Sequence, residues 1–162
     1  MQSMLSRFRT SGVLSVAPEG LAERLDTSAK LAVIAAQEES LVRSHEYTGT
    51  EHLLLSLLDT NNSGRQALTR LNVFGNDLRT QINTVIPEGT AQFGSVQSNP
   101  MTRNLEMSIE HAIDQAVQFG RTQIGCEHLV LGLVAQPQST AGQVLATNGL
   151  TVDLAATAVY RK

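Results

Sequence analysis

An eleven-residue pattern occurs twice in this chain, and it limits the possible folds more than any other feature. Residues 48–58 read TGTEHLLLSLL, and residues 124–134 read IGCEHLVLGLV. Gly, Glu, His and three Leu keep the same positions in both. A repeat of this kind indicates a duplicated structural unit whose copies share one core. The Glu-His pair ahead of an apolar helix permits three roles: a metal site, a catalytic acid and base, or a structural cap.

The repeat extends beyond the pattern. Shifting the sequence by 76 positions aligns residues 25–58 with 101–134, and ahead of the pattern apolar residues recur at steps of three and four. We therefore expect an amphipathic helix there in each half. Thr50 and Cys126 stand just before the next helix, where a Thr hydroxyl can accept a backbone N–H of the first turn.

Two further helices are expected in each half. The segments SGRQ (63–66) and TAGQ (140–143) both match the S/T-x-x-E/Q capping box, which predicts a helix start. Short turns then lead into last helices at about 77–86 and 153–160. No alternating β-branched run interrupts these patterns. The sequence therefore predicts an all-α fold, a duplicated four-helix repeat of about eight helices with pseudo-twofold symmetry.

The predicted organisation is an arm followed by a double repeat. Residues 1–22 form a flexible N-terminal arm, and residues 23–162 form the folded unit. Within that unit the first repeat takes residues 23–86, a linker bracketed by prolines takes 87–100, and the second repeat takes 101–160. The arm is rich in Ser and carries Arg, so an organellar transit peptide is the less favoured alternative for it.

Composition excludes several classes of function. The hydrophobic share of 41% supports a real core in a chain of 162 residues. The net charge of −3 leaves no basic footprint for nucleic acid. No segment reaches the roughly 20 apolar residues that span a bilayer. The single cysteine, Cys126, cannot form an intrachain disulfide, which fits the cytoplasmic location that we expect.

Two kinds of chemistry lack their motifs. No segment matches the phosphate loop GxxxxGK[ST], because neither Lys30 nor Lys162 follows a glycine-rich turn. A zinc protease needs His-Glu-x-x-His, whereas His45 has Gly49 four positions later. Neither histidine of the repeated pattern has a second ligand one helical turn away. We therefore expect no cofactor and no metal.

Cys126 supports a hypothesis of another class. Cys126 and His128 are two positions apart at a helix start, so their side chains point in different directions. The first repeat has Thr50 in place of Cys126, which favours a shared capping role. A helix N-terminus can lower the pKa of a thiol, however. A thiol-dependent enzyme or redox sensor using Cys126 therefore stands as the alternative to a non-enzymatic protein.

The glutamates of the repeated pattern, Glu51 and Glu127, have two readings. Each can complement the dipole of the helix that follows, a contribution of about 0.3–1 kcal/mol. Each is also held near the surface by a glycine turn, where its carboxylate can receive a guanidinium or ammonium group from a partner. The residues alone favour the first reading.

The doubled arrangement carries a resemblance. The segments AQEES (36–40) and HEYTGTEHLLLSLL (45–58) resemble the N-terminal Clp repeat domain of the Clp-family AAA+ unfoldases, especially the ClpC type. The resemblance covers about residues 24–160. It implies an all-α double repeat that binds adaptor proteins and substrates and passes them to an ATPase ring.

The resemblance also implies a site. In ClpC-type domains the Glu of each Thr-Glu-His is linked to recognition of phosphorylated arginine, and the matching positions are Glu51 and Glu127. The same pocket usually takes a Thr near the start of the first helix of each repeat. Thr102 matches it in the second repeat, whereas Asp26 stands in the first and would repel a phosphate. The pocket of the second repeat, with Glu127, is therefore the better candidate.

Two other positions depart from the family pattern. An Arg usually lies two residues after that Thr, where this chain has Ser28 and Asn104, and we take the neighbouring Arg103 as its substitute. Leu25 and Met101 replace the aromatic residue that usually precedes the Thr. Ligands that stack on an aromatic ring at that position are therefore not expected.

These observations predict a non-catalytic protein-binding module of the Clp protease and unfoldase system. It would bind through Glu51, Glu127, Thr102 and Arg103. Its partners would be Clp unfoldase or protease components, adaptor proteins and substrate proteins, arginine-phosphorylated ones included, but no nucleic acid and no membrane. Within the family we favour a stand-alone accessory protein over the N-terminal domain of a full-length ClpC-type ATPase.

Overall fold

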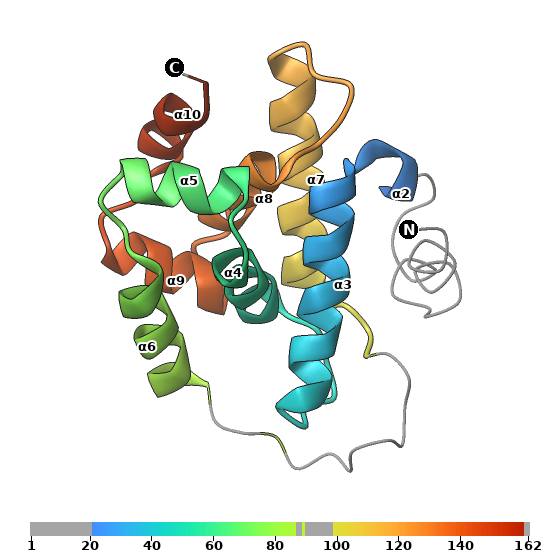
Figure 1. Cartoon of the computed structure of the whole chain (residues 1–162), viewed down its shortest axis with the longest axis vertical. Coiled ribbons are helices and arrows are strands. Elements are labelled where there is room, and N and C mark those ends of the chain that lie inside the picture. The colour runs from blue at the N-terminus through green and yellow to red at the C-terminus, as the bar shows by residue number, and fades with distance from the viewer. Residues whose placement is uncertain (1–20, 87–88, 90–98, 161–162) are drawn as a thin grey trace.

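The computed structural model describes residues 21–86, 89 and 99–160 (Figure 1). Residues 1–20 of the predicted arm lie outside the described residues, and so does the predicted linker except for residues 89, 99 and 100. The boundaries of the arm, the linker and the two repeats stay predictions.

The described residues form helices in two matching series, and no strand is found among them. The first series is α2 (Leu21–Arg24), α3 (Thr27–Val42), α4 (Thr50–Asp59), α5 (Ser63–Arg70) and α6 (Gly75–Val85). The second is α7 (Arg103–Gln118), α8 (Cys126–Val134), α9 (Thr140–Thr147) and α10 (Val152–Tyr160). From α3 and α7 onward, paired helices begin 76 or 77 positions apart. The predicted all-α fold with a duplicated four-helix repeat is confirmed.

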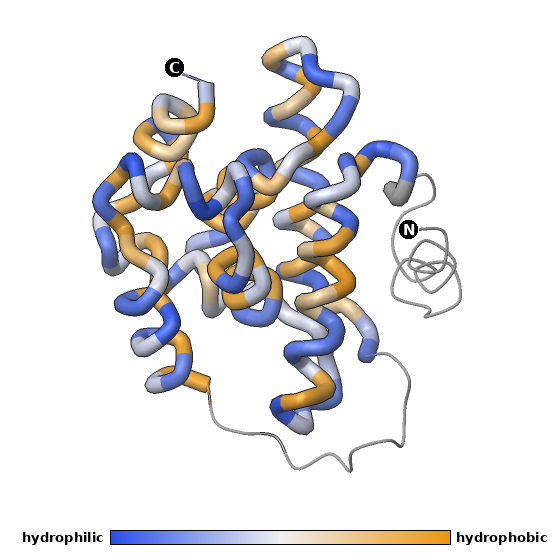
Figure 2. Tube along the Cα trace, in the orientation of Figure 1, coloured by the Kyte–Doolittle hydropathy of each residue, from blue (hydrophilic) through white to orange (hydrophobic). Residues whose placement is uncertain are grey.

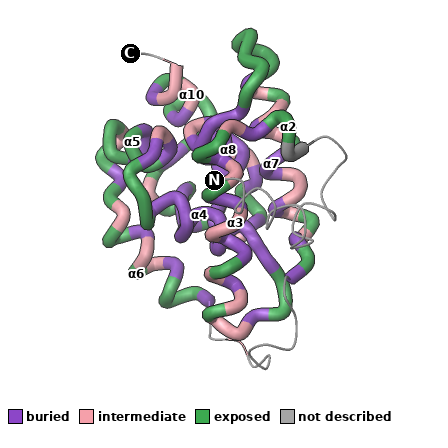
Figure 3. The backbone as a smooth tube through the Cα atoms, turned by 45° about the vertical axis from the view of Figure 1, so that its right-hand side comes forward, coloured by how far each residue is buried: buried purple, intermediate pink, exposed green. Residues whose placement is uncertain are grey.

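The two helices that carry the repeated pattern lie at the centre of the molecule. In Figure 1, α3 packs on α4 and α7 packs on α8 on one side of this central pair, and α5, α6, α9 and α10 lie on the other side. The three shared leucines of each pattern are no more than 1% exposed; they are Leu53, Leu55, Leu57, Leu129, Leu131 and Leu133. Figure 3 shows this buried centre, and Figure 2 shows the mixed polar and apolar residues of the helices around it. The duplicated apolar segments therefore form one shared core.

Histidines cap the two central helices. α4 begins at Thr50 and α8 at Cys126, so both residues lie inside the helix and the predicted cap by these residues is wrong. The backbone N–H of the preceding glycine instead donates to Nδ1 of the histidine three residues later, at 2.8 Å for His52 and 3.0 Å for His128. The Thr50 hydroxyl accepts from the backbone N–H of Ala141, in the other repeat, at 3.2 Å.

The next helix of each repeat begins one residue after its cap. The side chain of Asn62 accepts from the N–H of Arg65 at 2.9 Å, and the side chain of Ser139 accepts from the N–H of Gly142 at 3.0 Å. The predicted capping boxes at 63–66 and 140–143 are therefore wrong by one residue, because each helix begins at the residue that was expected to be its cap. Two adjacent capping residues stand at each site, and sequence alone does not choose between them.

The first long helix of each repeat begins against the other repeat. Leu25 forms a parallel bridge with Ile124, and Asp26 N–H donates to the Ile124 carbonyl at 2.9 Å. The matching bridge joins Met101 to Thr48, and Thr102 N–H donates to the Thr48 carbonyl at 2.9 Å. Residues at the start of α3 therefore lie beside the start of α8, and residues at the start of α7 lie beside the start of α4.

Close packing of α7 on α8 depends on one glycine. A Cβ added at Gly132 would overlap the backbone carbonyl oxygen of Ser108 and would lie 3.3 Å from Cβ of Ala112. The first repeat has Ser56 at this position, and its hydroxyl donates to the Ala32 carbonyl at 2.8 Å. The second pair of helices therefore approaches more closely than a side chain would allow.

We predict that Gly132→Ala lowers the free energy of unfolding by about 1–3 kcal/mol, the usual cost of overpacking a core. Urea denaturation followed by circular dichroism measures the loss. Gly75→Ala is the matched control, because a Cβ there meets Leu58 at an ordinary 3.5 Å. Equal stability of the Gly132 variant and the wild type would contradict the close approach.

Candidate binding site at the start of helix α8

Each repeat places a glutamate against a glycine at the start of its central helix. We name residues 49–52 the α4 entrance and residues 125–128 the α8 entrance. A Cβ at Gly49 would lie 2.7 Å and 2.9 Å from the carboxylate oxygens of Glu51, and a Cβ at Gly125 would overlap the carboxylate of Glu127. Both glycines have ordinary extended backbones, with φ of −111° and −99°. Glycine is therefore needed for space rather than for conformation.

The capping bonds fix the protonation of both entrance histidines. Nδ1 of His52 and of His128 accepts a backbone N–H, so the ring proton of each neutral histidine lies on Nε2. Burial lowers the pKa of His52 to about 3, and burial also lowers the pKa of His128. Burial therefore favours the neutral form of both rings, against the charge of the adjacent glutamate, whose carboxylate oxygen lies 3.9 Å from Nδ1 of His52 and 3.2 Å from Nδ1 of His128.

The α4 entrance is filled by side chains of its own repeat. Glu51 is only 4% exposed. Burial, together with the charge of Glu51 and a hydrogen bond to it, raises the pKa of Tyr47 to about 12. His45 stacks on Tyr47 with ring centroids 5.3 Å apart, and its Nδ1 lies 2.7 Å from Nε2 of His52. These contacts leave the Glu51 carboxylate occupied.

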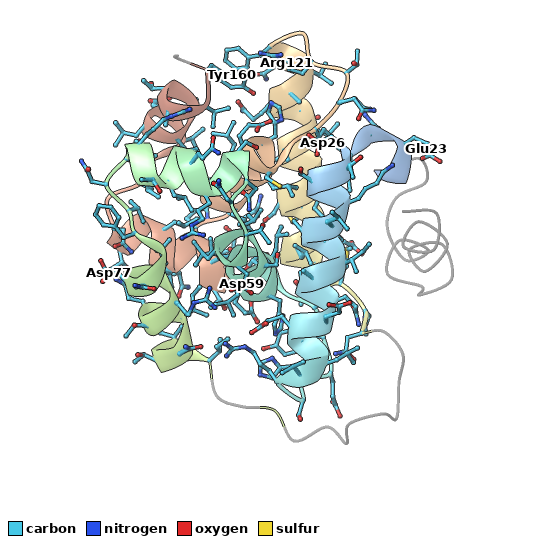
Figure 4. The ribbon with its side chains drawn as sticks, in the orientation of Figure 1. Glu23, Asp26, Asp59, Asp77, Arg121 and Tyr160 are labelled. Carbon is cyan, nitrogen blue, oxygen red and sulfur yellow. The ribbon has the colours of Figure 1, made fainter. Side chains whose placement is uncertain are left out.

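The α8 entrance opens into a cavity instead. The Glu127 side chain is 25% exposed, and the cavity beside it measures about 360 Å³. Its walls come from both repeats and consist of Asp26, Ser63, Gln66, Ala67, Arg70, Arg121, Gln123, Glu127, His128, Val159 and Tyr160. Figure 4 labels three of these residues in the upper half of the view: Asp26 before α3, Arg121 between α7 and α8, and Tyr160 at the end of α10. A ligand can therefore reach Glu127 where none can reach Glu51 without displacing side chains.

The cavity holds charges of both signs. The carboxylates of Asp26 and Glu127 both lie next to Gly125. A Cβ at Gly125 would overlap the Glu127 carboxylate and would lie 3.0 Å from an Asp26 oxygen. Two facing carboxylates repel each other, and a cation between them relieves that repulsion. Arg70 and Arg121 stand on other walls, and Arg70 is held by a 3.0 Å bond to the Ala158 carbonyl. The cavity therefore suits a group with a cationic end and an anionic end.

Two predicted site residues lie elsewhere. Thr102 caps α7, because its hydroxyl accepts from the N–H of Leu105 at 3.1 Å, and its backbone joins Thr48. Thr102 therefore belongs with the α4 entrance, and the expected pairing of Thr102 with Glu127 is wrong. Asp26, which was expected to weaken the other pocket, lies in the cavity of Glu127 instead. Arg103 has a 72% exposed side chain that lies 3.6 Å from Glu106.

Sequence reasoning missed Arg70, Arg121 and Tyr160. They come from α5, the α7–α8 loop and α10, and no local motif links those segments. One signal was present in the aligned repeats, where Arg121 stands opposite His45. A charged residue at a position that is apolar or neutral in the other copy marks a difference between the two entrances.

Cys126 is buried at the α8 entrance and suited to packing. It is 1% exposed, and burial together with the charges of Asp26 and Glu127 raises the pKa of its thiol to about 12. The thiolate, which is the reactive form, is therefore scarce at neutral pH.

Within the described residues, no group of three His, Cys, Asp or Glu side chains could hold a metal ion, and no helix is long and apolar enough to cross a membrane.

A family model and several curated relatives match the chain. The model of the Clp repeat (R) N-terminal domain matches residues 24–156. A ClpA homolog of the Clp protease ATP-binding subunit from Porphyra purpurea is 33% identical over 133 residues, 82% of this chain and 16% of the relative. Chloroplastic ClpC1 from rice is 30% identical over 160 residues, 98% of this chain and 17% of the relative. The chain thus spans about a sixth of the length of these relatives.

Solved structures share the fold. The N-terminal domain of ClpD from Arabidopsis thaliana superposes with a TM-score of 0.66 at 21% identity, covering 88% of this chain and 96% of that one. The N-domain of ClpV from Vibrio cholerae gives a TM-score of 0.72 at 16% identity, covering 85% and 83%. A ClpV N-domain in complex with a VipB peptide gives 0.68 at 14% identity, covering 88% and 92%.

We predict that the Cys126 thiol of the folded protein reacts with a disulfide reagent far more slowly at pH 7.5 than an ordinary thiol, because its pKa is raised to about 12. Absorbance of the released thiolate follows the reaction, and the same chain unfolded in urea is the control. Labelling of the folded chain as fast as the unfolded one would instead support a reactive cysteine.

Proposed function

The chain belongs to the Clp repeat N-terminal domain family, and on that premise we propose that it is a non-catalytic protein-binding module of a Clp protease and unfoldase system. Relatives that match it include Clp protease ATP-binding subunits and the Bacillus subtilis regulator ClpC/MecB. A ClpV N-domain of the same fold binds a VipB peptide. Adaptor proteins, substrate proteins and other Clp components are the partners that we propose here.

The observation that carries this proposal is the open α8 entrance. Glu127 is a quarter exposed, lies beside the carboxylate of Asp26 and faces a cavity that also contains Arg70 and Arg121. Two carboxylates at one point favour a cation, and a guanidinium bonds to carboxylates with planar, two-pronged geometry. An arginine side chain of a partner protein therefore fits with its guanidinium at Glu127.

A phosphate on that arginine would complete the match. N-phosphorylated arginine places a phosphate beside the guanidinium, and the arginines of the cavity can pair with it. Asp26 opposes the phosphate but supports the guanidinium, so the ligand is expected to enter with the guanidinium toward Asp26 and Glu127. We propose arginine-phosphorylated proteins as the partner class on these grounds.

Two arrangements of the protein are compatible with this role. The chain can act as a stand-alone accessory protein, or it can be the N-terminal part of a ClpC-type ATPase that is about six times longer, as its relatives are. The binding site is the same in both.

We propose the cytoplasm as its compartment, with an organelle as the alternative that the chloroplastic rice relative suggests. The raised pKa of the buried Cys126 thiol argues against the alternative of a thiol-dependent enzyme.

Calorimetry with free phosphoarginine tests the proposal. We expect binding by the wild type and a loss of affinity of at least about tenfold in Glu127→Gln, because the charged partner of the guanidinium is gone. Glu110→Gln is the control, since it removes the same charge from an exposed position on α7. No heat from the wild type, or equal heats from all three proteins, would refute recognition of phosphoarginine at Glu127.

A further inference from the structure

The two capping histidines, His52 and His128, differ in the hydrogen-bond partner of Nε2. Nε2–H of His52 donates to Nδ1 of His45 at 2.7 Å, since Nδ1 of His52 is already bonded to the backbone. The matching position in the second repeat is Arg121. A guanidinium has only donors, so it cannot accept the corresponding bond. His128 is 4% exposed, and among the described residues its Nε2 has no hydrogen-bond partner.

An unpaired buried donor is unusual and points to a missing acceptor. Nearly all buried polar groups in proteins are hydrogen-bonded, and leaving one unpaired costs free energy. His128 lines the cavity, with its ring centroid 5.8 Å from that of Tyr160. The other end of the ring is fixed by the bond to Gly125, so the ring cannot turn to satisfy Nε2 elsewhere.

The residue that fills the α4 entrance is also changed in the second repeat. Tyr47, which contacts Glu51 and stacks on His45, is replaced by Gln123. The Gln123 amide donates to the carbonyl of Glu23 at 3.1 Å, so its amide is engaged with the chain before α3. Both side chains that fill the α4 entrance are therefore absent from the α8 entrance.

A second groove is lined by α6 and α9, the helices that match α10 and α5, and its lining has no charged residue. It lies between α6 and α9 and has Thr140 and Thr147 where the charged cavity has Ser63 and Arg70. The residues that line this groove are Thr80, Gln81, Thr84, Val85, Thr140, Gln143, Val144 and Thr147. The α9 wall of this groove therefore lacks the charge that Arg70 gives the α5 wall of the cavity, and no residue of the α4 entrance lines the groove.

We propose that the chain has one ligand-binding entrance rather than two, and that His128 and Arg121 select the ligand there. The α8 entrance takes a bipolar group, whose cation lies at Glu127 and Asp26 and whose anionic acceptor receives Nε2–H of His128 and the Arg121 guanidinium. The α4 entrance is occupied by its own His45 and Tyr47. The proposal rests on the binding role proposed above and specifies which entrance acts and through which donors.

Nitrogen NMR of ¹⁵N-histidine-labelled full chain tests the donor. Phosphoarginine, arginine and inorganic phosphate are titrated separately, so that the bipolar probe is compared with each of its ends. We expect phosphoarginine to shift Nε2 of His128 while His52 stays unchanged, with one equivalent bound. Arginine and phosphate alone should bind at least about tenfold more weakly, because each engages one set of charges.

Arg121→His tests the asymmetry. This substitution gives His128 the acceptor that His45 gives His52, and it removes one ligand contact. We expect at least about a tenfold loss of phosphoarginine affinity with unfolding midpoints no lower than those of the wild type. Arg65→His is the control, because it makes the same change at an exposed position of α5 outside the cavity lining.

The possible results separate this inference from the proposed function. Two bound equivalents, equal shifts at both histidines, no shift at His128 with any probe, or full affinity in Arg121→His would each overturn the single entrance. Binding of the bipolar probe at His128, without binding of arginine-phosphorylated proteins, would support the single entrance and refute the proposed partner class.

Discussion

The bond from a glycine N–H to Nδ1 of the histidine three residues later organises each half of this molecule. It starts the central helix at a fixed residue, and it places the intervening glutamate back over the glycine, where only hydrogen fits. It also fixes the ring proton on Nε2, so the far side of each histidine is a donor. The two helix starts then differ in whether the neighbouring segment supplies a hydrogen-bond acceptor for Nε2–H.

Duplication supplied two such starts, and the surrounding residues made them different. In the first repeat, His45 and Tyr47 satisfy the histidine and cover the glutamate, so the local structure is closed and internally paired. In the second, Arg121 stands at the position of His45 and can accept no hydrogen bond from the histidine, and the glutamate faces a charged cavity. A shared core tolerates this difference, because the leucines of both patterns are buried behind the helix starts and do not contribute to them.

Sequence alone predicted the architecture well and the site only in part. The spacing of the apolar residues and the repeat identify the helices, because the pattern that marks α7 or α8 lies within one short segment of the sequence. The pairing of Asp26 with Glu127 depends instead on which repeat the first helix meets, and no local pattern encodes that choice. Arg70 is likewise an ordinary surface residue in sequence and becomes part of a site only because α5 packs against α8.

We propose that ligands enter at the α8 entrance and not at the α4 entrance. Backbone ¹H–¹⁵N spectra of the full chain, recorded while an arginine-phosphorylated peptide is added, test it most directly. We expect large, saturable shifts for the amides of Gly125 to His128 and none for those of Gly49 to His52. Shifts at the first set of amides that are equal to or larger than those at the second would contradict it.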